Sequence, residues 1–352
     1  MKAPNTLKEA TAQTSTERGG ERDHALDMVK GFLVLAMVVY HTATTFLPDG
    51  ALQHQIYHSL HIVSGSWIFI SGFIIIMHYR EKFGRNPTGI SRRLVVRGVK
   101  LLLLVSVLNF VITLLMRYDT LDSMLIPQAL WNIYVIGDGQ ASFEILIGIG
   151  YLLILGPLFL LHRTIGPLLA LILVAAGMGY QFVGTTQLPS NAWMLVCGLS
   201  GLLAGVAAAR GRLAALVFHP IAGRAALILA AVATVVYLGP LTTHWSLRTM
   251  LFAYIPGIVV SLLFLYILAT RLRWEGASEQ VFSLMAHYSL SCYVGQMFII
   301  MALHRIVGGH PILASYPVAL ILVVIFMLLG ILFLDKARQY YVRRSDVRIL
   351  SR

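Results

Sequence analysis

The chain of 352 residues has few charged residues and almost no cysteine. Charged side chains make up 12% of it, against about a quarter in a soluble domain, and the mean hydropathy is +0.78. Cys197 and Cys292 both lie in apolar segments, so neither a disulfide framework nor a thiolate metal site is indicated. Residues 1–26 lack the apolar core and small-residue cleavage site of a secretory signal. These absences exclude a soluble or disulfide-stabilised protein and leave an integral membrane protein.

Apolar sequence is abundant, since hydrophobic residues make up 58% of the chain. Charged and turn residues divide it into about ten segments of roughly 17–24 residues, the length that crosses a hydrocarbon core. We predict spans near 28–47, 60–78, 94–116, 142–161, 165–183, 192–209, 224–242, 249–270, 281–303 and 311–334. The expected fold class is an all-α integral membrane protein, a bundle of about ten transmembrane helices.

The basic residues indicate the orientation of this bundle. Of the 27 Lys and Arg residues, only Arg117, Arg248 and Arg305 fall in loops that ten spans would place outside. Cytoplasmic loops retain Lys and Arg, so we expect both termini in the cytoplasm and the protein in a bacterial-type plasma (inner) membrane. The net charge of +12 then reflects topology rather than nucleic-acid binding. The expected organisation is a flexible cytoplasmic tail (1–26), a ten-helix membrane domain (27–335) and a basic cytoplasmic tail (336–352).

One helical stripe in the first span carries ionisable groups. From Asp27 the steps to Lys30, Val34, Met37 and His41 are three or four residues, which keeps all five on one helix face. An α-helix separates Lys30 from His41 by about 16 Å along its axis. Ionisable side chains inside a membrane are costly, so this stripe predicts a functional site with a charge at one surface and an imidazole well inside.

A basic cluster begins the third span. Arg92, Arg93 and Arg97 lie within about one and a half helical turns, and Lys30 belongs to the same membrane surface. Their guanidinium groups could hold a pyrophosphate in bidentate fashion. The alternative is that they orient the protein and attract anionic lipid headgroups. Both interpretations remain open at this point.

Polar groups near the opposite surface suggest a base and its partner. Glu144 enters the fourth span at a depth similar to that of His41, and a contact between them would orient the imidazole and raise its basicity. The alternative is that Glu144 faces water. His54, His58 and His61 share one helix face, which indicates an interfacial amphipathic helix rather than a zinc site. No metal is predicted.

Several short motifs carry a family resemblance. Residues 25–31 (ALDMVKG) followed by His41 resemble the "LDxLRG … H" opening of the membrane acyltransferase superfamily. This superfamily includes acyltransferase family 3, with its periplasmic-glucan modifying branch, and the heparan-α-glucosaminide N-acetyltransferase-like proteins. Residues 69–74 (FISGFI) resemble the family's "FFxxSGFLI" span, and Ser289, Leu290 and Tyr293 resemble its late "GxxSLxxYxxH" motif. The basic residues 92–97 fall where the family's basic motif precedes the third span.

Three residues or spacings depart from the family pattern. Lys30 stands where the family usually has Arg, which keeps the charge but loses bidentate geometry. Gln296 stands where the late motif usually ends in His, which places more weight on His41. The basic cluster reads Arg-Arg-x-x-x-Arg where many members have Arg-x-x-Arg.

The resemblance implies a membrane-bound, acyl-CoA-dependent acyltransferase. It would transfer an acyl group, with acetyl favoured, from cytoplasmic acyl-CoA to a hydroxyl or amine of an extracytoplasmic acceptor, with a glycan or glycoconjugate favoured. His41 would act as general base or acyl carrier with Glu144 beside it. The donor would be held by Lys30, Arg92, Arg93, Arg97, Ser71 and Gly72, with Asp27, Ser289, Tyr293 and Gln296 in orienting roles.

Other interpretations of these residues exist. Gly72 could serve helix packing, and the Ser71 hydroxyl could bond to its own helix. For the whole chain, the alternative is a transporter or exporter of a small polar or glycan-linked molecule, with His41, Glu144 and Lys30 forming a proton or substrate path. The chain shows no convincing internal repeat, which disfavours a transporter. The expected partners are acyl-CoA, the acceptor and the lipid bilayer, and a homo-oligomer is left open.

Overall fold

The computed structural model describes residues 23–116, 126–137, 143–183, 188–211, 224–225, 228, 231–232, 247–271, 276–307 and 315–350, and these contain no strand. Its helices are α2 (His24–Phe46), α3 (Ala51–Leu60), α4 (Ile62–Arg85), α5 (Pro87–Met116), α6 (Ile126–Trp131), a short π-helix (Asn132–Ile136), α7 (Glu144–Leu160), α8 (Ile165–Val183), α9 (Ser190–Ala209), α12 (Leu247–Arg271), α13 (Ala277–His287), α14 (Ser289–Val307) and α15 (Tyr316–Leu350). The predicted all-α fold class is confirmed.

Among the described residues, 7 helical stretches are long and apolar enough to cross a membrane. They lie in α2, α3 with α4, α5, α9, α12, α14 and α15, and the shorter apolar helices are α7 and α8. The chain therefore has the helices of an integral membrane protein. The predicted span at 224–242 lies mostly outside the described residues, and the count of ten stays a prediction.

The predicted span at 281–303 was wrong in its first part. The chain turns at Tyr288, which ends α13 and begins α14, so the apolar helix runs from Ser289 to Val307. The backbone N–H of Cys292 donates to the carbonyl of Tyr288 at 2.8 Å, which starts the new helix. The turn at His287, Tyr288 and Ser289 contains no Gly or Pro, and apolar residues lie before and after it, so hydropathy averaged over a span joins the two helices.

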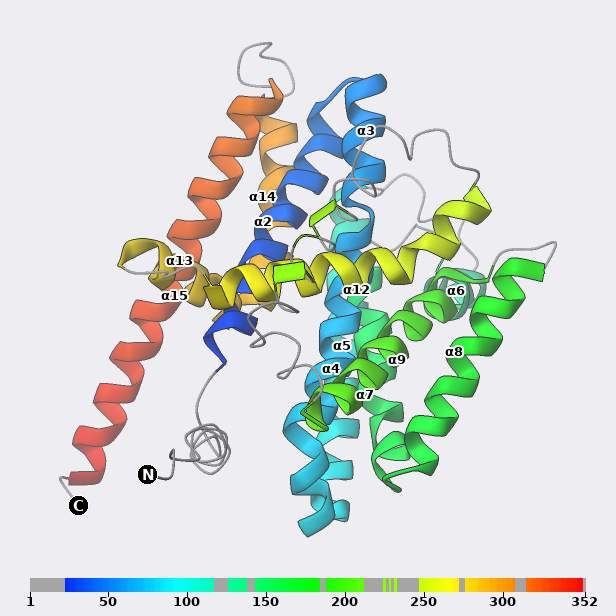
Figure 1. Ribbon diagram of the computed structural model, residues 1–352. Helices are drawn as coiled ribbons and strands as arrows, with labels where there is room; N and C mark the ends of the chain where they lie inside the picture. Colours follow the sequence, from blue (N-terminus) through cyan, green and yellow to red (C-terminus); the bar gives the residue numbers. More distant parts are fainter. Residues whose placement is uncertain are drawn as a thin grey trace, which may run out of the picture.

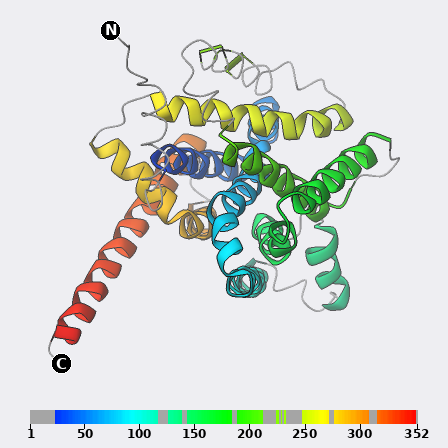
Figure 2. The same cartoon turned by 60° about the horizontal axis from the view of Figure 1, so that its bottom comes forward.

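Helix α2 begins with a side-chain cap and lies among several other helices. Asp23 accepts a hydrogen bond from the backbone N–H of Leu26 at 3.1 Å, which satisfies one of the free donors of the first turn. The helix contacts α4, α12, α13, α14 and α15. Helix α12 crosses α2 and α4 at a steep angle in Figure 1, and Figure 2 shows its yellow ribbon along one side of the bundle.

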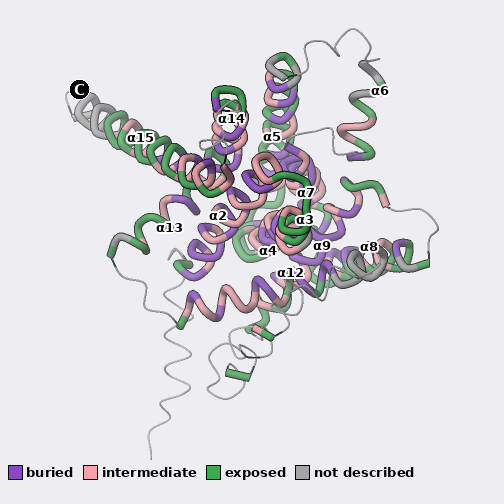
Figure 3. The backbone as a smooth tube through the Cα atoms, turned by 90° about the horizontal axis from the view of Figure 1, so that it is seen from above, coloured by how far each residue is buried: buried purple, intermediate pink, exposed green. Residues whose placement is uncertain are grey.

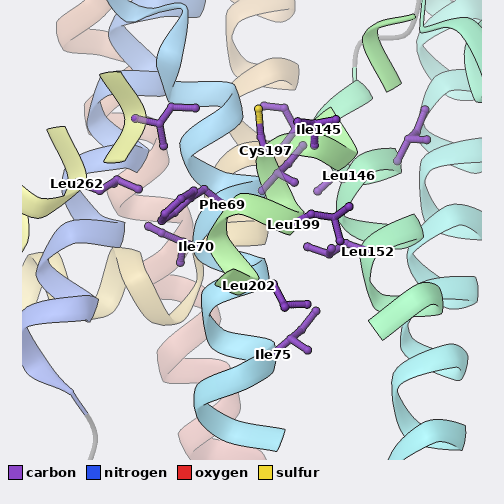
Figure 4. Close-up of a cluster of buried hydrophobic side chains, with 14 of the residues drawn as sticks. Phe69, Ile70, Ile75, Ile145, Leu146, Leu152, Cys197, Leu199, Leu202 and Leu262 are labelled. Carbon is purple, nitrogen blue, oxygen red and sulfur yellow. The ribbon is translucent and has the colours of Figure 1, made fainter. Parts of the chain in front are cut away.

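The tightest helix packing joins α4 and α9. A Cβ atom added at Gly72 would lie 2.0 Å from the carbonyl oxygen of Gly198, and one added at Gly201 would lie 1.9 Å from that of Phe69. Only glycine permits backbones to approach so closely, which is the usual role of small residues between membrane helices. Side chains from α4, α7, α9 and α12 fill the core around this contact (Figure 4).

Apolar side chains also cover the outside of the bundle. Large hydrophobic residues are exposed along α5, α8 and α15, for example Leu103 (62%), Ile172 (55%) and Phe333 (72%). Figure 3 shows these exposed stretches in green, most clearly on α15. An apolar surface on this scale is what helices facing lipid present.

The orientation of the chain can be tested with reporter fusions. Reporters placed after residue 49, within 120–138 and near residue 308 are expected outside, because few Lys and Arg lie in those loops. Reporters within 82–90 and after residue 340 are expected inside. Activity of a reporter that works only outside the cytoplasm measures this, and a cytoplasmic result at 120–138 contradicts both the span count and the orientation.

Candidate functional site

The polar stripe predicted on the first span lies on the inward face of α2. Asp27 is buried, and Lys30 Nζ lies 3.6 Å from its Oδ1, so the two charges form an ion pair one turn apart. Val34 and Met37 are buried farther along the helix. The Nε2 atom of His41 is buried without a hydrogen-bond partner among the described residues. A buried polar atom without a partner is costly, which marks His41 as a candidate reacting group.

A cavity of ≈ 270 Å³ begins at Lys30 and follows this stripe. Five helices line it: α2 (Lys30, Met37), α4 (Trp67, Ile70, Ser71, Ile74), α5 (Leu101), α7 (Ile145, Leu146, Ile149) and α14 (Ser289, Leu290, Tyr293). Lys30 is the one charged side chain in this lining, and nearly all other surfaces are apolar. The cavity therefore suits a slender, weakly polar group that carries an anion at the Lys30 end.

The motif residues of α4 fall on different sides of that helix. Ser71 lines the cavity, and its hydroxyl donates to the carbonyl of Trp67 at 2.9 Å, as the alternative interpretation expected. Gly72 packs against Gly198 of α9 instead. Ser71 is thus placed to contact a molecule in the cavity, while Gly72 has a packing role that explains it without a ligand.

Aromatic rings surround His41 at the far end of the cavity. The His41 ring centroid lies 5.1 Å from that of Tyr40 and 6.3 Å from that of Tyr293, which lines the cavity. Glu144 lies within electrostatic range of both tyrosines. The Nε2 atom of His41 has no hydrogen-bond partner among the described residues, so His41 and Glu144 are related here through the tyrosines that both neighbour. The structure therefore brings both predicted residues to one place.

A second buried polar group lies beside them. Gln296 is 0% exposed, and neither its Oε1 nor its Nε2 has a partner among the described residues. It lines a small void together with Val34, Met37, Trp67 and Tyr293, and the last three of these also line the main cavity. The free amide of Gln296 thus borders the end of the cavity nearest His41.

The basic cluster lies at the surface, and Arg97 is its member nearest the cavity lining along α5. Arg97 donates a hydrogen bond to the hydroxyl of Tyr79, and Leu101, one turn further along α5, lines the cavity. His78, next to Tyr79 on α4, lies within electrostatic range of Lys30. Lys30 and Arg97 thus each lie near the same part of α4, but Arg97 does not itself line the cavity. All three arginines, Arg92, Arg93 and Arg97, are exposed on α5.

Histidines and tyrosines continue from His41 towards α3. The Tyr57 ring lies 5.7 Å from Tyr40 and stacks on His61 at 5.7 Å, and His61 lies 5.2 Å from Tyr254. The hydroxyl of Tyr254 donates to the carbonyl of His61 at 3.0 Å. A helix, α3, is found where an interfacial helix was predicted, and its position at the interface stays a prediction. His54 is exposed on it, and the side chain of His58 lies outside the described part.

Two residues of the site were not identified from the sequence. Trp67 lines both the cavity and the void beside Gln296, and Tyr40 contacts His41. Each lies close to a recognised motif. Trp67 is two residues before Phe69, and Tyr40 directly precedes His41. The sequence signal for both residues is a large aromatic side chain next to a motif in an apolar helix. Periodicity could not show which neighbouring helix that side chain faces.

Comparison with known proteins identifies the family. The family model for acyltransferase family 3, described as an acyltransferase domain, matches residues 23–336. Neither a curated protein nor a solved structure matches the chain. The matched segment contains every residue that lines the cavity, together with His41, Glu144 and Gln296. The chain therefore belongs to acyltransferase family 3, and the cavity lies within its acyltransferase domain.

Proposed function

We propose that the protein transfers an acyl group, acetyl in the first instance, from cytoplasmic acyl-CoA to an acceptor on the other side of a plasma (inner) membrane. The cavity between Lys30 and Tyr293 is the observation that carries this proposal. Acyl-CoA has an anionic end and a long, flexible arm that ends in the thioester. Lys30 and His41 are separated by about 16 Å along α2, which is of the order of that arm.

The anionic end of the donor would lie at the entrance. Lys30 supplies a point charge there, and Arg97, held by Tyr79, supplies a guanidinium that can bind a phosphate through two hydrogen bonds. The apolar lining excludes water from the arm between them and the reacting carbon. Arg93, one turn before Arg97, would add a more exposed charge at the same surface.

Chemistry would take place beside His41. Acting as general base, its Nε2 takes the proton of the acceptor hydroxyl or amine while the acceptor atom bonds to the thioester carbon. The carbon–sulfur bond breaks, and CoA leaves as a thiolate that takes up a proton. Acting as acyl carrier, Nε2 itself would attack the thioester first. Its burial without a partner supports either role.

Glu144 and Gln296 would assist this step. Glu144 supplies negative charge next to Tyr40 and Tyr293, and these rings position the imidazole between them. The Gln296 amide would donate to the thioester oxygen as negative charge develops on it. The acceptor, a glycan or glycoconjugate in this proposal, would approach from the aromatic side chains around Tyr57 and His61.

Purified protein in detergent tests the proposal directly. Binding of acyl-CoA and its slow hydrolysis or transfer are expected, and both should be measured with the wild type and with His41→Ala. Absence of acyl-CoA binding by well-folded wild-type protein contradicts the proposal. It would also reopen the transporter interpretation.

Removal of the entrance charge should weaken donor binding. Arg97→Ala is expected to reduce acyl-CoA affinity by about 1.5–3 kcal/mol, the range for a hydrogen bond to a charged group. Isothermal titration or competition binding measures the change. Arg85→Ala, at the exposed end of α4, is the matched control and should matter little. Equal small losses in both variants would show that these arginines act only through general surface charge.

A further inference from the structure

A second, basic cavity lies on another side of α4. Its volume is ≈ 150 Å³, and it is enclosed by the end of α4, the end of α7 and the start of α8. Arg80, His162 and Arg163 supply its polar groups, while Phe83 and Phe159 are among its apolar walls. It shares no lining residue with the cavity that begins at Lys30. The proposed acyl transfer therefore leaves this site without a role.

The polar groups of this cavity are donors without an anionic partner. No Asp or Glu lines it. Within the described part of the chain, neither Arg80 nor Arg163 forms an ion pair or hydrogen bond. The Nδ1 atom of His162 accepts from the backbone N–H groups of Thr164 at 3.2 Å and Ile165 at 3.3 Å. This assigns the ring proton to Nε2, which makes that nitrogen a further donor.

The surroundings of the cavity indicate what kind of anion it holds. Leu161 in its lining is 65% exposed, and Ile165 and Leu168 continue this exposed apolar surface along α8 at 61% and 56%. A free phosphate ion gains nothing from such walls, whereas a phospholipid has an anionic head and apolar chains. The basic residues here also lie on the side that the charge distribution assigns to the cytoplasm.

We propose that this cavity binds an anionic glycerophospholipid of the inner leaflet, with its phosphate between Arg80, Arg163 and His162. The guanidinium groups hold the phosphate oxygens through charge-assisted hydrogen bonds. The acyl chains lie along Leu161 and the outer face of α8. Because the lipid contacts α4, α7 and α8 together, its binding stabilises the packing of these helices. This assignment does not depend on the proposed acyl transfer.

Thermal unfolding of the purified full chain in detergent tests the assignment. Added phosphatidylglycerol is expected to raise the unfolding temperature, whereas phosphatidylcholine and inorganic phosphate at equal concentration should not. In Arg80→Gln/Arg163→Gln the apparent affinity for phosphatidylglycerol should fall at least about tenfold. Arg85→Gln/Arg210→Gln removes the same charge from exposed positions outside the cavity and should bind like the wild type.

Three outcomes would overturn the assignment. Equal stabilisation by inorganic phosphate indicates a free-phosphate site, and equal loss in the control variant indicates diffuse surface charge. Equal stabilisation by phosphatidylcholine indicates that the headgroup charge is not recognised. If the double variant does not fold, Arg163→Gln alone serves, because this exposed side chain has no partner in the described part of the chain. An unchanged affinity in that variant also rejects the site.

Discussion

His41→Ala is expected to lower acyl transfer by about 10²–10⁴-fold, the usual contribution of general acid–base catalysis. Acyl-CoA affinity should stay within a few fold of the wild type, because the proposed phosphate position is at Lys30, about 16 Å from His41 along α2. The imidazole Nε2 has no hydrogen-bond partner among the described residues, so its removal leaves no buried partner unsatisfied there. A large loss of turnover with retained acyl-CoA binding would therefore show that His41→Ala impairs the reaction rather than the folding of the protein.

The measurement needs both rates and binding. Turnover of the variant and of the wild type should be compared in detergent with a saturating donor, and binding should be titrated separately. His54→Ala, which removes an exposed imidazole from α3, is the matched control and should keep full turnover. If His41→Ala keeps full turnover, the chemistry does not use α2. The next candidate is then His287, at the end of α13 beside Arg338.

The site on α2 could be predicted because helical spacing determines which residues share a face. Lys30, Met37 and His41 recur at steps of seven and four residues, and the structure places this face towards the cavity and its far end. The order of the motifs along the chain likewise predicted that α4, α5 and α14 contribute to the site. These conclusions need only local geometry and a family pattern.

What the sequence did not reveal depends on helix rotation and on breaks inside apolar runs. Ser71 and Gly72 are neighbours in one motif, yet one faces the cavity and the other packs on α9. Residues 67–77 of α4 are apolar apart from Ser71 and Gly72, so polarity does not show which face meets which helix. The break at Tyr288 was hidden because it contains no Gly or Pro and lies between the apolar residues of α13 and those of α14.

The second large effect is expected at Gln296, where stability and activity should change in opposite directions. Its side chain is 0% exposed, and both amide atoms lack partners among the described residues. A buried polar group left unsatisfied costs about 1–3 kcal/mol, and an apolar group of similar shape avoids that cost. Methionine is unbranched and close to glutamine in length. Gln296→Met is therefore expected to unfold at a higher temperature than the wild type in the absence of acyl-CoA.

The same substitution should impair the reaction. If the amide donates to the thioester oxygen as charge develops, its loss reduces turnover by about 10²–10³-fold, as for one oxyanion-hole donor. Acyl-CoA affinity should change little, because this interaction strengthens only in the transition state. Thr42→Val is the matched control, since it removes a buried hydroxyl that also has no partner in the described part of the chain and lies outside the residues that line the cavity. That variant should keep its turnover.

The two measurements together distinguish a catalytic amide from a structural one. A structural glutamine would have partners, so Gln296→Met would lower the unfolding temperature and reduce activity only as far as folded protein is lost. A higher unfolding temperature with full turnover would show that the amide takes no part in the reaction. Only increased stability combined with a large loss of turnover and nearly unchanged donor affinity fits the proposed role. That combination would mean that the chain keeps an unsatisfied amide beside Tyr293 because the reaction requires it.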